Sequence, residues 1–279
     1  MSAISPITRA KIKGYLEVFV DGAIEQQKKR EIPTFDDPRS YLNKTSSKPK
    51  LKPFHAAIIP QEILKINEFE RSFSTTLGTT FEEAARLIAL EHHAEVSRSF
   101  EIQGEVSSAA LREIENQVVV FERAARVGEE RPSLEKMIEA VLNARDVGEI
   151  SPRTARSDLY IRTYDGVELF FEIKSPAPNK DQCLSMTQRI LRHHLIRGLP
   201  RPQVQSYFAM AYNPYGPDRK DYKWSVAKMY LPFEQATLIG HEFWNIVGGP
   251  TAYEELLDIY YEVGRDKTKH IIDSLAFGF

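Results

Sequence analysis

The segment 157–174, SDLYIRTYDGVELFFEIK, constrains the fold more than any other stretch of the chain. It contains two short runs rich in β-branched and aromatic residues, separated by a turn at Tyr164, Asp165 and Gly166. This pattern predicts a β-hairpin. Gly166 can adopt the left-handed backbone conformation that closes a three-residue loop containing a bulge.

The loop length decides which side chains face each other across this hairpin. A two-residue loop would send the carboxylates of Asp158 and Glu172 to opposite faces of the sheet. A three-residue loop places them on the same face and leaves the other face apolar apart from Thr163. We therefore expect the pairs Thr163 with Val167, Arg162 with Glu168, Ile161 with Leu169, Tyr160 with Phe170, Leu159 with Phe171, and Asp158 with Glu172.

Two carboxylates that face each other at roughly 5 Å repel unless a positive charge lies between them. A hard divalent cation is the natural candidate, because Mg²⁺ binds one or two carboxylates together with water and phosphate oxygens. Lys174 lies on the same strand face as Glu172. The open end of the hairpin thus predicts half of a metal site that a phosphodiester could complete.

The order of these residues resembles the catalytic core of the PD-(D/E)XK nuclease superfamily. Asp158 is followed by thirteen residues and then by Glu172-Ile173-Lys174, and Ser157 stands where the motif often has proline. The acid-x-Lys triplet alone is weak, because it also occurs at Asp218-Arg219-Lys220 and Asp221-Tyr222-Lys223. Only the first triplet lies on a predicted hairpin with an acid across from it.

The sequence after the hairpin is similar to the TdeIII group of type II restriction endonucleases. The stretches that carry this similarity are EIKSPAPNKDQC, the basic helix after it, YFAMAYNPYG and YKWS, within about 77–264. The resemblance implies an α/β restriction-endonuclease-like core, in which helices flank a mixed central sheet. It also implies Mg²⁺-dependent cleavage of double-stranded DNA at a GGNCC-type palindrome, leaving 5′-phosphate and 3′-hydroxyl ends.

The same resemblance assigns roles to residues and partners. Asp158, Glu172 and the Ile173 carbonyl would hold the metal, and Lys174 would orient the attacking water. Reading a palindrome on both strands implies a two-fold symmetric homodimer. A cognate DNA methyltransferase would act on the same site without needing to bind this chain.

A third acid is expected from the stretch LGTTFEEAARLIALEHH, which predicts an amphipathic helix. On a helical wheel Glu82 lies at the edge of the apolar face, whereas Glu83 points away. Many PD-(D/E)XK nucleases resemble this, with a glutamate from the first core helix near the metal. Glu82 matches that position, although a solvated glutamate is an equally good interpretation.

Residues that could contact DNA cluster around the hairpin. Before it, Arg153 and Arg156 could grip phosphates. A predicted helix over 180–197 turns an apolar stripe to the sheet and a basic, amide-bearing face outward, and a loop follows a predicted strand over 205–212. The candidates from the helix and the loop are Lys180, Gln182, Gln188, Arg189, Arg192, Asn213, Arg219, Lys220 and Lys223. A solvated helix surface and ordinary turn chemistry remain alternatives for these two segments.

Composition limits the remaining possibilities. The net charge of -2 gives no overall nucleic-acid signature, so a DNA-binding face must come from local clusters of Lys and Arg. Cys183 is the only cysteine, which excludes a disulfide framework and suits a reducing compartment. No apolar run approaches twenty residues, so we expect a soluble, cytoplasmic protein without a membrane partner.

The expected organisation has three parts. Region 1–76 combines helices near 7–30 and 61–72 with a basic arm over 28–53, which is either a DNA-following arm or a solvated linker. Region 77–230 is the catalytic core with a helical insertion at 94–150, and region 231–279 is a helical extension. Two other functions stay open: a structure-specific or repair nuclease such as a junction resolvase, and a non-catalytic DNA-binding protein.

Overall fold

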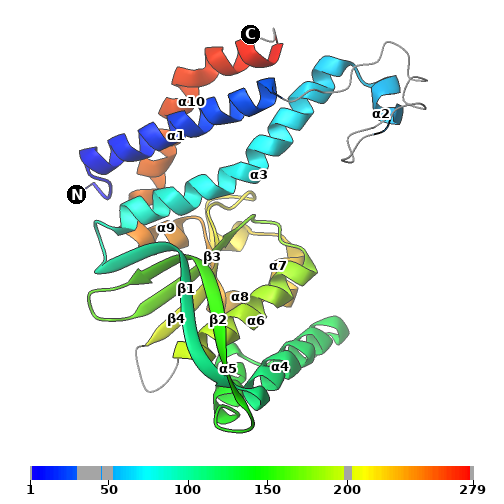
Figure 1. The fold of residues 1–279 in the computed structure, drawn as a ribbon, viewed down its shortest axis with the longest axis vertical. Coiled ribbons are helices and arrows are strands. Elements are labelled where there is room, and N and C mark those ends of the chain that lie inside the picture. Colours follow the sequence, from blue (N-terminus) through cyan, green and yellow to red (C-terminus); the bar gives the residue numbers. More distant parts are fainter. Residues whose placement is uncertain (1, 30–44, 46–52, 198–202, 277–279) are drawn as a thin grey trace. The chain divides into compact units, whose positions relative to one another are not determined.

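The computed structural model of this chain describes residues 2–29, 45, 53–197 and 203–276. At its centre is a five-stranded sheet with the strand order β1-β2-β3-β4-β5. Strands β1 (Glu95–Ser107), β2 (Ile150–Arg162) and β3 (Glu168–Lys174) are antiparallel neighbours, and β4 (Val204–Met210) and β5 (Thr237–Ile239) continue the sheet in parallel (Figure 1). The expected α/β class with a mixed central sheet is confirmed.

Helices cover both faces of this sheet. They are α4 (Ser108–Val127), α5 (Leu134–Asn143), α6 (Lys180–Arg197), α7 (Ser225–Tyr230), α8 (Phe233–Ala236) and α9 (His241–Gly248). The neighbouring residues Phe170 and Phe171 point to opposite faces of the sheet, because successive side chains of a strand alternate. Phe170 stacks on His193 of α6 with a centroid distance of 4.8 Å, and Phe171 meets Phe243 of α9 edge-on at 5.5 Å.

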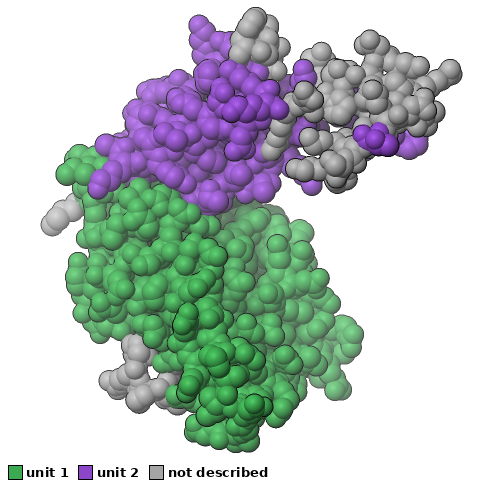
Figure 2. All heavy atoms as spheres, viewed as in Figure 1, with its two compact units in different colours: residues 1–8, 81–256 green, residues 9–80, 257–279 purple. Residues whose placement is uncertain are grey.

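The described residues form two compact units (Figure 2). The first contains residues 1–8 and 81–256, with the whole sheet, and the second contains residues 9–80 and 257–279. The second unit contains α2 (Pro53–Ile58) and most of α1 (Pro6–Lys28), α3 (Gln61–Ala89) and α10 (Ala252–Ala276). Residues 81–89 of α3 belong to the first unit. The functional division at residues 76 and 230 stays a prediction.

The second unit is helical. The buried apolar residues of α1 are spaced four apart and form one stripe: Ile12, Leu16, Val20 and Ile24. Lys13 of α1 pairs with Glu262 and Asp266 of α10 at 2.6 and 3.1 Å. The helix expected over 7–30 is confirmed, whereas the basic arm over 28–53 lies almost wholly outside the described residues.

Three expectations about the elements are wrong. Residues 95–107, expected within a helical insertion, form the long strand β1, although the helices near 107–127 and 133–145 are confirmed as α4 and α5. The two helices expected over 61–93 are one helix, α3, because a glycine inside a helix costs only about 1 kcal/mol and Gly78 does not break it. The C-terminal extension also contains the short strand β5. No helix among the described residues is long and apolar enough to cross a membrane.

Candidate active site

The hairpin forms with the three-residue loop that its side chains predict. Gly166 has a φ of 87°, and the amide of Thr163 donates to the Val167 carbonyl at 3.0 Å. The paired residues run from Arg162 with Glu168 to Leu159 with Phe171, as expected. Arg162 and Glu168 face each other across the hairpin but form no ion pair. Arg162 pairs with Glu95 of β1, and Glu168 accepts a hydrogen bond from Tyr160.

At the open end of the hairpin, one ammonium group joins two carboxylates. Nζ of Lys174 lies 3.1 Å from Oδ2 of Asp158 and 2.9 Å from Oε1 of Glu172. Asp158 is not a ladder partner of Glu172; instead its Oδ2 accepts the backbone amide of Ile173 at 2.9 Å. The structure therefore brings both predicted acids and the lysine to one rim of the sheet.

The charge of Lys174 is stabilised in this position. Burial alone lowers the pKa of its ammonium, but the carboxylates of Asp158 and Glu172 outweigh burial and raise that pKa above its usual value. Lys174 is therefore protonated at neutral pH, so it acts as a cation and hydrogen-bond donor and not as a base.

A break in two strands positions Asp158. Residue Ser99 of β1 has a φ of 52°, in the left-handed region, between the pairs Arg98 with Leu159 and Phe100 with Ser157. Residues two apart in a regular strand share a face. Here Arg98 contacts α3, while Phe100 stacks on Tyr160, on the α6 face, at 4.0 Å. The kink lies opposite Asp158.

Glu82 lies near this rim. Burial raises the pKa of its carboxyl, Arg98 opposes the rise, and the charges of Asp158 and Lys174 also act on it. Its Oε2 accepts from Nη2 of Arg98 at 2.9 Å, and the same guanidinium holds Glu83 at 2.9 Å. The expectation that Glu83 points away is wrong, because its side chain is only 15% exposed and Arg98 clamps both glutamates.

The face of α6 that meets the sheet is not purely apolar. Arg189 pairs with Glu172, and Arg197 lies 3.4 Å from Glu168. His193 between them is buried and its Nδ1 lies 2.9 Å from the Ser206 hydroxyl. The expectation that all basic residues of this helix face outward is wrong, because the buried acids of β3 attract two of the arginines to the sheet. Nothing in the α6 sequence separates inward from outward arginines until the partner strand is known.

The other candidate DNA contacts occupy different settings. Arg153 and Arg156 lie within β2, on exposed positions, because the strand begins earlier than expected. Exposed candidates are Lys180, Gln182, Lys220 and Lys223, and half-buried ones are Gln188 and Arg192. Asn213 accepts from the amide of Tyr215 and donates to the Asp218 carbonyl, so it shapes a turn.

Arg219 already has partners within the chain, and Cys183 is buried. Arg219 forms two hydrogen bonds to Glu242, at 2.7 and 2.8 Å, and contacts Glu234 and the Thr237 carbonyl. Cys183 is fully buried, and burial raises the pKa of its thiol to about 12. A thiolate nucleophile at Cys183 is therefore excluded at neutral pH.

The donor set at the rim suits a hard cation. Among the described residues, no group of three or more His, Cys, Asp or Glu side chains could hold a metal, so a borderline metal such as Zn²⁺ lacks its usual ligands. Two carboxylates remain, and one oxygen of each, Oδ2 of Asp158 and Oε1 of Glu172, already contacts a cation at the rim, the ammonium of Lys174. Mg²⁺ uses few protein carboxylates and completes its shell with water and phosphate, so these residues fit it.

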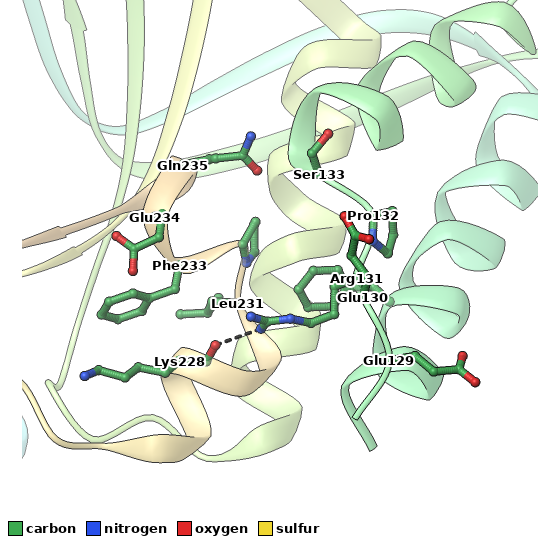
Figure 3. A pocket seen from close by; sticks show the side chains of 12 residues that line it. Glu129, Glu130, Arg131, Pro132, Ser133, Lys228, Leu231, Phe233, Glu234 and Gln235 are labelled. Carbon is green, nitrogen blue, oxygen red and sulfur yellow. Dashed lines mark hydrogen bonds between the residues drawn. The ribbon is translucent and has the colours of Figure 1, made fainter. Parts of the chain in front are cut away.

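A cavity of about 540 Å³ lies elsewhere in the first unit (Figure 3). The segment 129–133 forms one wall, residues 231–235 form another, and Arg131 donates to the carbonyls of Lys228 and Met229 across it at 2.7 and 2.6 Å. None of the candidate site residues lines this cavity.

Comparisons with known proteins agree on one family. The family model described as "Type II restriction endonuclease, HinfI" matches residues 13–264. Two type II restriction enzymes of Herpetosiphon aurantiacus, HgiEI and HgiBI, are 45% and 44% identical to this chain over 273 residues, which is 98% of this chain and 99% of each relative. A third enzyme of that organism, HgiCII, is 44% identical over the same length. No solved structure matches.

Proposed function

Because the chain belongs to the HinfI family of type II restriction endonucleases, we propose that it cuts double-stranded DNA at a short specific sequence through Asp158, Glu172 and Lys174. The observation that supports this assignment most is the single ammonium that joins two carboxylates from neighbouring strands. A surface hairpin with solvated charges would leave such groups apart. Here Glu172 is 5% exposed and Asp158 accepts a backbone amide.

Each residue has a role in the proposed reaction. Asp158, Glu172 and the Ile173 carbonyl would hold a divalent ion, which supplies a Lewis acid for the phosphate and lowers the pKa of water. The Ile173 amide fixes the Asp158 carboxylate, so that one of its oxygens stays directed at the rim. Lys174 keeps a positive charge beside the scissile phosphate and donates a hydrogen bond to the attacking water. Glu82 would add a further carboxylate.

Type II restriction endonucleases generally use a divalent metal ion, and we propose that this chain uses Mg²⁺. We also propose membership of the PD-(D/E)XK superfamily, a resemblance to the TdeIII group, and a GGNCC-type palindrome as the target. A palindrome favours a homodimer, in which each subunit cuts one strand, and a cognate methyltransferase that protects the same sequence. The candidate DNA contacts keep their proposed roles, except that Arg189, Arg219 and Asn213 would have to leave their present partners to contact DNA.

Digestion of a sequenced plasmid tests this function. Purified protein with Mg²⁺ should give discrete fragments whose mapped ends share one short sequence and carry 5′-phosphates, and EDTA should abolish the cutting. Asp158→Asn, which keeps the shape of the side chain and removes its charge, is the control for a contaminating nuclease. Cutting only of branched or damaged DNA would favour a repair nuclease, and DNA binding without any Mg²⁺-dependent cutting would favour a non-catalytic protein.

A further inference from the structure

A row of α6 side chains matches a row of β3 side chains. Arg189, His193 and Arg197 are spaced four apart, and they meet Glu172, Phe170 and Glu168, which are spaced two apart. Four helical residues rise about 6 Å and two strand residues about 6.6 Å, so the two repeats stay in step over this length. Each buried glutamate of β3 thereby receives one arginine of α6.

The two ion pairs at the ends of this row are closely matched. The side chains of Arg189 and Glu172 are 36% and 6% exposed, and those of Arg197 and Glu168 are 36% and 7% exposed. The difference is the second partner of each glutamate. Glu168 accepts from the Tyr160 hydroxyl at 2.8 Å, within the core, whereas Glu172 shares Lys174 with Asp158 at the rim.

The two carboxylate oxygens of Glu172 contact different cations. Lys174 contacts Oε1, and Arg189 contacts Oε2. In the proposed reaction Lys174 turns to the phosphate and the attacking water, which removes the cation on Oε1. A buried carboxylate that loses its partners is costly and rotates to find others. Arg189 always carries its charge, so it still holds Oε2 when Lys174 has moved.

We propose that Arg189 is a positioning residue, which fixes the orientation of Glu172 and directs Oε1 towards the rim. This inference rests on the proposed function, and it replaces the direct DNA contact expected of Arg189. Arg189 touches no reacting atom in this role; it acts through Glu172. Arg197 pairs with a buried glutamate outside the site, through Nε at 3.4 Å, and has the same exposure as Arg189, so it is the matched control.

Four proteins test the proposal: wild type, Arg189→Met, Arg189→Lys and Arg197→Met. Three quantities should be measured: kcat and KM on a cognate duplex with Mg²⁺, the Kd for that duplex in EDTA, and the melting temperature without metal. Misplacing a catalytic group by about 1 Å costs about 100-fold in rate. Arg189→Met should therefore lose about 100-fold in kcat, with KM and Kd within twofold of wild type.

The controls separate positioning from stability. Arg197→Met should lower the melting temperature as much as Arg189→Met does, yet keep kcat within twofold of wild type. Arg189→Lys, which keeps the charge, should have a kcat at least tenfold higher than that of Arg189→Met. If Arg189→Met does not fold, Arg189→Lys is compared with Arg197→Met in its place.

Two results would overturn the inference. Equal kcat losses in Arg189→Met and Arg197→Met would make Arg189 a structural residue only. A weakened Kd in EDTA with unchanged kcat would make it a DNA contact. Failure of the wild type to cut DNA would count against the proposed function itself, which the wild-type reaction shows before any variant is compared.

Discussion

The same acid-x-Lys spacing occurs in two regions of the molecule with opposite outcomes. On β3, the Glu172 side chain is 6% exposed, and its lysine partner also holds Asp158 of the neighbouring strand. At the short helical turn η2 (Arg219–Asp221), the side chains of Asp218 and Lys220 are 59% and 79% exposed and pair with each other at 3.1 Å. Spacing alone does not distinguish these two triplets.

The difference between the triplets is the tertiary context. On β3 the sheet supplies a second acid, and α6 covers the buried glutamate from one side. At η2 the pair of Asp218 and Lys220 is exposed, and the tertiary contacts are made by the middle residue, Arg219, whose guanidinium binds Glu242 of α9 and the Thr237 carbonyl of β5. A lysine that joins a buried glutamate to a second acid can change the energetics of a reaction, whereas an exposed ion pair contributes little.

Removal of the two lysines should separate the triplets most strongly. Lys174→Ala should lower kcat for DNA cleavage by roughly 10³-fold, because a fixed positive charge at the scissile phosphate is lost. Lys220→Ala should keep kcat within twofold and change only KM, since Lys220 is at most a phosphate contact. Steady-state kinetics on one duplex give both numbers. Equal effects on kcat would erase the distinction between the triplets.

For the middle residues of the two triplets, Ile173 and Arg219, we expect the larger loss of stability at η2 and not at β3. Arg219→Met should lower the free energy of unfolding by about 2 kcal/mol, because Glu242 and the Thr237 carbonyl lose charged hydrogen bonds. Ile173 contributes its backbone to the site, so Ile173→Val should cost about 1 kcal/mol through lost burial alone. Urea unfolding without metal measures both changes. A smaller loss in Arg219→Met than in Ile173→Val would contradict this assignment.

The hairpin could be predicted because its constraints are local. One glycine and the alternation of side chains fix the register, and the structure has the expected pairs from Arg162 with Glu168 to Leu159 with Phe171, but not the pair of Asp158 with Glu172. β1 was not predicted: Phe100, Ile102 and Val106 alternate with polar residues, but Arg98 and Gly104 interrupt this pattern. The direction of Arg189 was missed because it depends on a glutamate in another element. Sequence reveals which charges exist, and packing decides which of them meet.

His193 of α6, the helix that covers the β3 triplet, should make the stability of the protein depend on pH. Burial, with the nearby charges of His194, Arg189 and Arg192, lowers the pKa of His193 to about 3, below the value of about 6.5 expected in the unfolded chain. The unfolded state then binds more protons, so stability falls as pH drops below about 6.5. For this one group the loss at pH 5.5 is about 1.4 kcal/mol relative to pH 8.

His193→Asn tests this dependence, because asparagine can still bond to the Ser206 hydroxyl but does not titrate. The variant should lose less stability than wild type between pH 8 and 5.5 in urea unfolding. Burial also lowers the pKa of His194, to about 4, so part of the slope should remain. An unchanged slope would show that His193 is not neutral in the folded protein.

The kink opposite Asp158 should give the smallest effect and the most specific one. A left-handed conformation costs a non-glycine residue about 1 kcal/mol, and glycine avoids that cost. Ser99→Gly should therefore leave stability unchanged or raise it by up to about 1 kcal/mol. Ser97→Gly, two residues earlier in the same strand, should lower it by about as much, because glycine weakens a regular strand. Thermal unfolding of both variants checks the sign. Equal destabilisation by the two glycines would mean that Ser99 is not strained, and the position of Asp158 would then need another cause.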